Sequence, residues 1–167
     1  QNPILCADYS DPDIVRVGDD FFMVSSSFNH VPALPILHST DLVNWTIINH
    51  VMDELPLPGY DRYQPGKGVW APSIRWHDGK LWVCFSTPDE GIFICHTEDP
   101  WGEWSAPHCL REARGWIDPC PFWDDDGNAY MAHAYAKSRC GIKHRIDVCR
   151  MAPDASRLLD DGVEVFN

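Results

Sequence analysis

The sequence predicts an all-β fold built from the blades of a β-propeller. Three segments share one design, an x-Pro step, a strand, an acidic or glycine-containing turn and a second strand, and they start at Asp11, Ala71 and Asp118. Their prolines, at positions 12, 72 and 119, lie 60 and 47 residues apart (72 − 12 and 119 − 72), near the roughly 40 to 50 residues of a propeller blade plus insertions. Helical periodicity is nowhere sustained, and 14 Pro with 11 Gly divide the chain into short segments, as an all-β fold requires.

The turn of each segment has the residues of a tight hairpin. Gly18-Asp19-Asp20, Asp78-Gly79 and Asp126-Gly127-Asn128 each lie between two β-rich runs. Glycine and aspartate tolerate the backbone conformations that such reversals need. We therefore expect three hairpins of one kind.

Further short strands complete each unit. They are expected at 36–39 and 45–49, at 92–97 and 104–110, and at 144–151 and about 163–166. Four strands make one blade. This predicts blade 1 at about 11–50, blade 2 at about 71–110 and blade 3 at about 118–167, all within a single domain spanning 1–167.

Three blades do not close a ring, because closed propellers have about four to eight blades. An open blade edge exposes unpaired backbone groups that invite pairing with another strand. We expect the remainder of the propeller or another chain to cover this edge.

Composition limits the partners. Hydrophobic residues make up 44% of the chain, which is enough for a core, and the net charge is −12. Nucleic acid and anionic membrane surfaces would repel such a protein, so a neutral ligand fits better. No run of about 18 apolar residues is present, and residues 1–5 do not read as a signal peptide. The compartment, cytoplasmic or secreted, stays open.

The seven cysteines do not suggest redox or zinc chemistry, because none forms a C-x-x-C pair. We expect most of them to be buried, reduced thiols, as Cys84, Cys95 and Cys149 lie in or beside apolar runs.

The Asp124–Asn128 run resembles a calcium loop only superficially. The D-x-D-x-D-G spacing is missing and no Glu follows at the twelfth position, so a solvated hairpin turn is the preferred interpretation. The eight histidines form no H-E-x-x-H pattern. We expect no protein-bound metal and no cofactor.

Asp11 and Asp118 are the candidate catalytic residues. With Ala71, they directly precede the first strand of their units. In a propeller, the first strand of each blade lines the central axis, and all these strands run in the same direction. Two carboxylates are thus expected at one mouth, which suits acid/base work on a glycosidic bond. For either Asp alone, an Asp-Pro turn is an equal alternative; the repetition favours a site.

Aromatic residues flank these positions. Trp70 precedes Ala71, Trp116 lies two residues before Asp118, and Phe28 follows the second strand of the first unit. Sugar rings stack their C–H faces on such side chains. Core packing, or wedging between blades, is the alternative for each Trp.

Four ordered segments resemble glycoside hydrolase family 43, above all its β-xylosidase and α-L-arabinofuranosidase members. They read NPILCADYSDPDIVRVGDDFFMVSSSF, LPILHSTDLVNW, GVWAPSIRWHDGKLWVCFST and GWIDPCPFWDDDGNAY. The resemblance implies a five-bladed propeller of inverting enzymes, with this chain as the N-terminal part of the catalytic domain.

The resemblance also assigns roles. It implies that Asp11, rather than its neighbours Asp8 and Asp13, is the general base, and that Asp118 orients the general acid and tunes its pKa. Phe28 and Trp70 match aromatic positions that line the sugar pocket, and Trp116 matches less closely.

The general-acid Glu of the family has no match in the chain. It is expected in an E-G-P motif, and Glu164 lies in GVEVF, which resembles the strand just before that motif. We expect the acid beyond Asn167.

The implied function is an inverting, exo-acting hydrolase that takes oligosaccharide substrates and cleaves xylosyl or arabinofuranosyl linkages of plant hemicellulose. The sequence does not decide whether the enzyme is specific for xylose or for arabinose. The alternative is an inactive carbohydrate-binding or scaffold propeller fragment.

Overall fold

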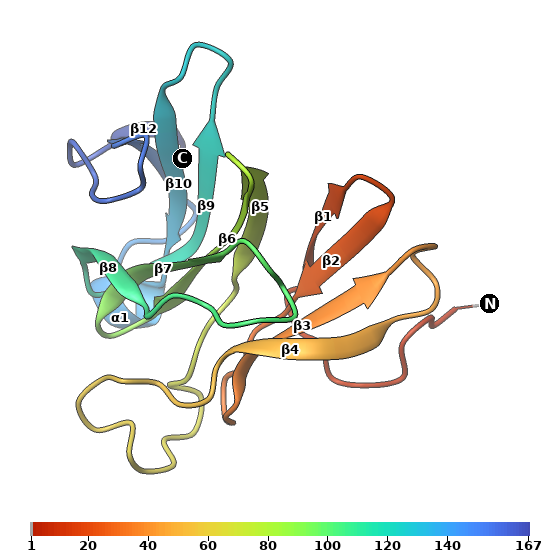
Figure 1. The fold of residues 1–167 in the computed structure, drawn as a ribbon. Coiled ribbons are helices and arrows are strands. Elements are labelled where there is room, and N and C mark those ends of the chain that lie inside the picture. The colour runs from red at the N-terminus through yellow and green to blue at the C-terminus, as the bar shows by residue number, and fades with distance from the viewer. Residues whose placement is uncertain (1) are drawn as a thin grey trace.

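The computed structural model describes residues 2–167 and contains three four-stranded antiparallel sheets (Figure 1). In each sheet, neighbouring strands follow one another along the chain. The first sheet consists of β1 (Asp13–Val17), β2 (Asp20–Val24), β3 (Ala33–Ser39) and β4 (Thr46–Met52). The second consists of β5 (Ser73–His77), β6 (Lys80–Thr87), β7 (Gly91–Thr97) and β8 (His108–Glu112). The third consists of β9 (Trp116–Trp123), β10 (Ala129–Tyr135), β11 (Ile146–Met151) and β12 (Val163–Phe166).

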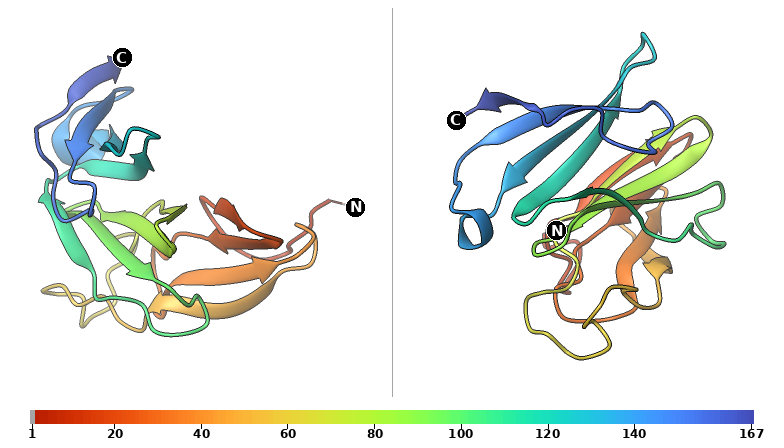
Figure 2. Two further views of the ribbon diagram at one scale, coloured as in Figure 1. Left: turned by 45° about the horizontal axis from the view of Figure 1, so that its top comes forward. Right: turned by 90° about the vertical axis from the view of Figure 1, so that its left-hand side faces the viewer.

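The three sheets follow one another as blades of an arc (Figure 2). We call them blades 1, 2 and 3 in chain order. Only one helix is present in the described residues, the short α1 (Lys137–Cys140) between β10 and β11. Among residues 2–167, no helix has the length and apolar character needed to cross a membrane.

The first strands of the blades, β1, β5 and β9, run along the inner side of the arc and contact one another in that order (Figure 2). Polar side chains link them. Arg75 of β5 donates from Nη1 to Oδ2 of Asp13 in β1 (2.6 Å) and from Nη2 to Sγ of Cys120 in β9 (2.8 Å). The Ser73 hydroxyl donates to the Pro119 carbonyl over 2.6 Å. These contacts fix the relative positions of the inner strands.

Two apolar clusters hold the blades together. The first is formed by blades 1 and 2 and includes Leu34, Ile36, Ile74 and Phe85. The second is formed by blades 2 and 3 and includes Met131, which has no exposed surface. The strand β6 is buried along almost its whole length, because its two faces contribute to different clusters. Side chains that alternate across a strand make this double burial possible.

The hairpin turns form where the sequence predicts them. Asp78 and Gly79 take φ values of 48° and 73°, as the two central residues of a type I′ turn require. In the β9–β10 turn, Oδ1 of Asp124 accepts hydrogen bonds from the backbone N–H groups of Asp126 (3.0 Å) and Asn128 (2.7 Å). The aspartate run therefore closes a hairpin with its own carboxylate.

The expectation that most cysteines are buried is wrong. All seven are free thiols, but only Cys84, Cys95 and Cys149 are buried, whereas Cys6 and Cys109 are exposed. Cys109 lies in β8, the outer strand of blade 2. Local hydrophobicity cannot distinguish such a strand from a central one, which explains the error.

The last strand, β12, presents apolar side chains to solvent. Val163, Val165 and Phe166 are 68%, 59% and 61% exposed. A covering element for this edge remains a prediction.

Candidate active site

Asp11 lies two residues before β1, at the mouth end of the arc, by which we mean the end at which β1, β5 and β9 begin (Figure 1). Its carboxylate is exposed. The hydroxyl of Ser26, a buried residue just after β2, lies 3.1 Å from Oδ2 of Asp11 and 2.9 Å from the Ser10 carbonyl. This hydroxyl can orient the carboxylate without removing it from solvent.

Asp118 is the third residue of β9 and lies at a β-bulge, so it is inside the first strand of blade 3 and does not directly precede it as the sequence predicts. Ile117 pairs with Ala134 and Cys120 with Ala132, so two residues of β9 oppose only His133. Bulges re-aim side chains and are common beside active sites. Here the bulge coincides with the predicted catalytic aspartate.

The two aspartates share an unusual backbone conformation. The φ angles of Asp11 and Asp118 are 51° and 54°, in the left-handed region that few non-glycine residues adopt. Blades 1 and 3 therefore present their carboxylates from matching positions with matching backbone geometry. The sequence repeat predicts the position; the backbone conformation needs the structure.

The electrostatics of the mouth couple the two carboxylates. Asp118 is reachable by solvent, but surrounding protein atoms remove part of its hydration, which raises its pKa above the ordinary value; the negative charge of Asp11 raises this pKa further. Both effects disfavour the ionised carboxylate. The structure thus brings Asp11 and Asp118 into one electrostatic site.

Phe28 and Trp70 are also brought together. Their ring centroids are 6.0 Å apart, with the rings inclined at 67°. The Trp70 indole donates from Nε1 to the Gly66 carbonyl (3.0 Å). Between them, the backbone N–H of Gly68 donates to the Phe28 carbonyl (2.9 Å). A Cβ on Gly68 would lie 2.3 Å from the Ser27 carbonyl oxygen, so only glycine permits this approach.

Arg139 of α1 is a residue of this region that the sequence does not point to. Its guanidinium carbon lies 5.5 Å from the centre of the Trp70 ring, and its Nε lies 3.3 Å from Oδ1 of Asp89. A cation over an indole face attracts the ring. Through α1, blade 3 thus contacts the aromatic pair formed by blades 1 and 2.

Trp116 has a different environment from Phe28 and Trp70. Its ring stacks on the buried His133 with 3.7 Å between centroids, and the guanidinium carbon of Arg111 lies 5.6 Å from its centre. It also packs against the cluster between blades 2 and 3. One ring face is therefore occupied by protein, and a role for Trp116 in sugar binding stays a prediction.

Glu164 lies in β12, as the sequence indicates, and its carboxylate is 3.3 Å from Nε of Arg145. This ion pair belongs to the outer edge of blade 3. Within residues 2–167, no cluster of side chains suited to a metal ion is found.

Comparison with known proteins places the chain in a family. The model of the family described as Glycosyl hydrolases family 43 matches residues 1–167. A "Putative beta-xylosidase" of Xylanibacter ruminicola is 40% identical over 158 residues, which are 94% of this chain and 29% of the relative. A "Xylosidase/arabinosidase" of Butyrivibrio fibrisolvens is 43% identical over 135 residues, which are 77% of this chain and 25% of the relative. The chain thus spans less than a third of these relatives.

Solved structures give the same result. The structure described as Bacteroides ovatus Xyloglucan PUL GH43B superposes with a TM-score of 0.83 at 30% identity, over 98% of this chain and 32% of its own. A GH43_12 protein retrieved from a capybara gut metagenome gives a TM-score of 0.83 at 34% identity, with the same coverage. These matches confirm the predicted fold class, with three blades of the family's five-bladed β-propeller in this chain. The chain therefore belongs to glycosyl hydrolases family 43.

Proposed function

We propose that the complete protein is an inverting, exo-acting glycosidase that cleaves xylosyl or arabinofuranosyl linkages of hemicellulose oligosaccharides, with Asp11 as general base. The observation that carries this proposal is the matched pair of carboxylates at the mouth. Asp11 and Asp118 occupy equivalent positions in blades 1 and 3 with φ angles of 51° and 54°, and the charge of Asp11 raises the pKa of Asp118.

Asp11 suits the role of the base. Its exposed carboxylate can accept a proton from a water molecule, and Ser26 holds one oxygen over 3.1 Å. The activated water attacks the anomeric carbon from the face opposite the leaving oxygen, whose bond to that carbon breaks. A carboxylic acid on the other side of the sugar protonates the leaving oxygen, about 6.5 to 9.5 Å from the base in enzymes of this kind.

Asp118 suits a supporting role. A negative charge beside a carboxylic acid raises the pKa of that acid and keeps it protonated, which a general acid needs near neutral pH. We propose that Asp118 acts in this way on a general acid supplied from outside the 167 residues, and that it orients that acid.

The aromatic residues support a sugar as substrate. Phe28 and Trp70 offer ring surfaces near the mouth, inclined to each other at 67°, and both are only partly buried. Relatives of this chain are described as beta-xylosidase and as a non-reducing end alpha-L-arabinofuranosidase. These names favour a pentose at the non-reducing end as the sugar that is released.

The proposal is tested with the complete protein, 4-nitrophenyl β-D-xyloside and 4-nitrophenyl α-L-arabinofuranoside. We expect release of nitrophenol from at least one of them, and nuclear magnetic resonance during the reaction should first show the sugar with inverted anomeric configuration. Sugar binding without any hydrolysis would instead favour a binding protein. A product that first appears with retained configuration would rule out Asp11 as the base of a single displacement.

A further inference from the structure

The inner strand of blade 2 lies between the two strands that belong to Asp11 and Asp118. Blade 2 has Ala71 at the position where blades 1 and 3 have these aspartates. Its first strand, β5, contacts β1 on one side and β9 on the other (Figure 2). The separation of the two carboxylates therefore depends on how β5 is attached to both neighbours.

Arg75 is the side chain of β5 that reaches both neighbouring strands. Its Nη1 donates to Oδ2 of Asp13 in β1 over 2.6 Å, and its Nη2 donates to Sγ of Cys120 in β9 over 2.8 Å. Asp13 lies two residues after Asp11, and Cys120 lies two residues after Asp118. A guanidinium is planar and presents its donors in a fixed geometry. One rigid group thus connects the strand of one aspartate to the strand of the other.

The attachment of Arg75 to β1 is firm. Besides the bond from Arg75, Oδ2 of Asp13 accepts the backbone N–H of Ile74 (2.9 Å), and Oδ1 accepts the backbone N–H of Ile14 (3.1 Å). The side chains of Arg75 and Asp13 are only 33% and 31% exposed. An ion pair that is shielded from much of the solvent is stronger than a fully exposed one. Asp13 is therefore a fixed point to which Arg75 is bound.

The attachment to β9 lies at the bulge. The hydroxyl of the buried Ser73 donates to the carbonyl of Pro119 over 2.6 Å, and Arg75 donates to Cys120. Pro119 and Cys120 are the two residues that directly follow Asp118. A bulge interrupts the regular pairing of a strand with its partner, so these bonds from β5 hold the part of β9 whose pairing with β10 is irregular.

We propose that Arg75 is a positioning residue of the candidate active site, which holds Asp118 at a fixed place relative to Asp11. The inference rests on the proposed function and adds a residue that acts through the two inner strands. Two arguments make the separation matter. The interaction between two charges falls with their distance, and displacing a catalytic group by about 1 Å can cost on the order of 10²-fold in rate.

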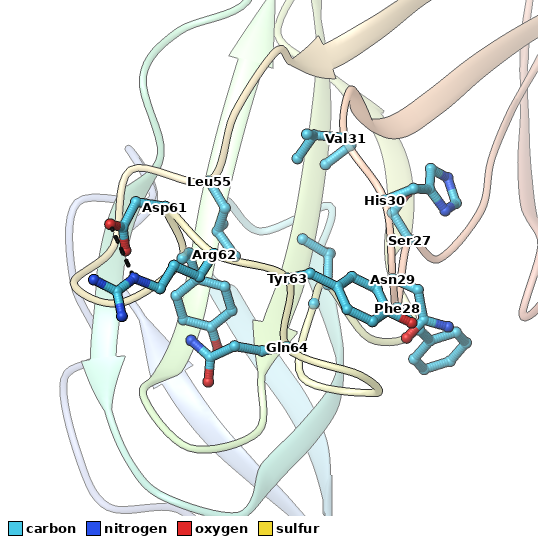
Figure 3. A pocket seen from close by; sticks show the side chains of 14 residues that line it. Ser27, Phe28, Asn29, His30, Val31, Leu55, Asp61, Arg62, Tyr63 and Gln64 are labelled. Carbon is cyan, nitrogen blue, oxygen red and sulfur yellow. Dashed lines mark ion pairs between the residues drawn. The ribbon is translucent and has the colours of Figure 1, made fainter.

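Arg75 is separate from the ring surfaces proposed to bind the sugar. Phe28 is among the residues that line a cavity of about 250 Å³ between the segment after β2 and the loop connecting β4 to β5 (Figure 3), and Trp70 packs against Phe28. Arg75 does not line this cavity, and its hydrogen bonds within residues 2–167 run to other residues than these two. Substituting Arg75 should therefore change kcat and leave sugar binding unchanged.

The test is a double-mutant cycle in the complete protein, with an aryl pentoside as substrate. Arg75→Met removes both hydrogen bonds and keeps an unbranched side chain. It should lower kcat about tenfold, which corresponds to a displacement of less than about 1 Å, and leave KM within about twofold of wild type. In an Asp118→Asn background, the same substitution should lower kcat by less than about twofold, because the charge that Arg75 positions is absent.

Arg75→Lys separates positioning from stability. Lysine keeps the charge and can pair with Asp13, but its single ammonium lacks the fork that also reaches Cys120. Its Tm should be closer to that of wild type than the Tm of Arg75→Met, whereas its kcat should stay lowered. Arg150→Met is the matched control, because Arg150 forms an ion pair with Asp160 (2.9 Å) but is 68% exposed, and this variant should keep the kcat of wild type.

An unchanged kcat in Arg75→Met, an equal loss in both backgrounds, or full kcat in Arg75→Lys would overturn the positioning role while the proposed function stands. If Arg75→Met does not fold, Cys120→Ala decides, because it removes only the bond to β9 and should lower kcat only where Asp118 is present. A wild type that does not hydrolyse the pentoside would instead remove the proposed function.

Discussion

The two ends of the inner strands meet the same backbone requirement with different residues. At the turn end, Gly18, Gly79 and Gly127 take φ values of 63°, 73° and 81°, which glycine adopts without steric cost; Asp78, with a φ of 48°, is the aspartate among these turn residues. At the mouth end, Asp11 and Asp118 take φ values of 51° and 54°. The mouth end keeps side chains where glycine would be the unstrained choice. Such local strain is typical of functional sites.

Blade 2 shows that the blade architecture itself does not impose this strain. Ala71 occupies the equivalent position, but its φ is not positive. The left-handed conformation therefore accompanies the carboxylates of blades 1 and 3. This difference indicates that the left-handed conformation orients the carboxylates of Asp11 and Asp118, and that the chain can enter the first strand of a blade without it.

Asp118→Asn is the substitution that tests the role of this mouth-end carboxylate. Asparagine tolerates the left-handed φ and has nearly the same shape, so the backbone should keep its conformation. Losing the charge that orients the proposed general acid should lower kcat in the complete protein on the order of 10²-fold, as misplacement of a catalytic group does. Steady-state kinetics on an aryl pentoside measure this loss, and an unchanged kcat would remove Asp118 from the mechanism.

Asp118 also makes a prediction about stability. Its pKa is raised in the folded state, first by the partial loss of hydration and then by the charge of Asp11, so the folded state binds this proton more tightly than the unfolded state. Stability should therefore fall as pH rises from about 4 through the folded pKa. Asp118→Asn cannot ionise and should not show this loss.

Thermal unfolding at several pH values checks this prediction. The difference in Tm between Asp118→Asn and wild type should grow from low pH to neutral pH and then become constant. In an Asp11→Asn background, the same difference should shrink, because one cause of the raised pKa is gone. A difference that does not depend on pH would contradict the raised pKa of Asp118, and an unchanged pH dependence in the Asp11→Asn background would show that the two carboxylates are not coupled.

Arg139 offers a smaller test of the mouth end. Arg139→Ala removes the guanidinium 5.5 Å from the Trp70 ring, an interaction of about 0.5 to 1 kcal/mol at exposed sites. As a positioning residue, Arg139 should affect KM up to about fivefold and kcat less. Arg139→Lys keeps the charge and should restore part of the affinity. A loss confined to kcat would contradict this role.

The smallest expected effect lies at the turn end. A Cβ added in Gly18→Ala would have no neighbouring atom within 4 Å, but φ is +63° at this position. The substitution should therefore lower the free energy of unfolding by about 1 kcal/mol. Urea denaturation measures this change. Because the turn is at the opposite end of β1 from Asp11, kcat/KM should remain that of wild type, and a loss of activity would mean that the two ends are not independent.

Much of the fold is visible in the sequence, because the repeated x-Pro hairpins occur once per blade and the turn residues punctuate them. The pairing of Asp11 with Asp118 follows from the same repeat, since equivalent positions of inner strands converge. The contribution of Arg139 does not. It depends on contacts with Trp70 and Asp89, which lie far away in the chain, and Arg139 belongs to no repeated pattern.

The bulge at Asp118 is also hidden, because it arises from a register shift opposite His133 and not from a local motif. The exposed Cys6 and Cys109 show a further limit. A cysteine in an apolar context can be buried or exposed, depending on whether its strand is central or outer.

Asp11 as general base is the central claim, and a matched pair of substitutions in the complete protein tests it most directly. Asp8 is a good control, because it is exposed, precedes the same strand and accepts a hydrogen bond from the Ser10 hydroxyl over 2.8 Å. Asp11→Asn should lower kcat/KM for the aryl pentoside about 10² to 10⁴-fold, the usual contribution of general acid/base catalysis, and Asp8→Asn should leave it unchanged. Full activity in Asp11→Asn, or an equal loss in both variants, would contradict the account.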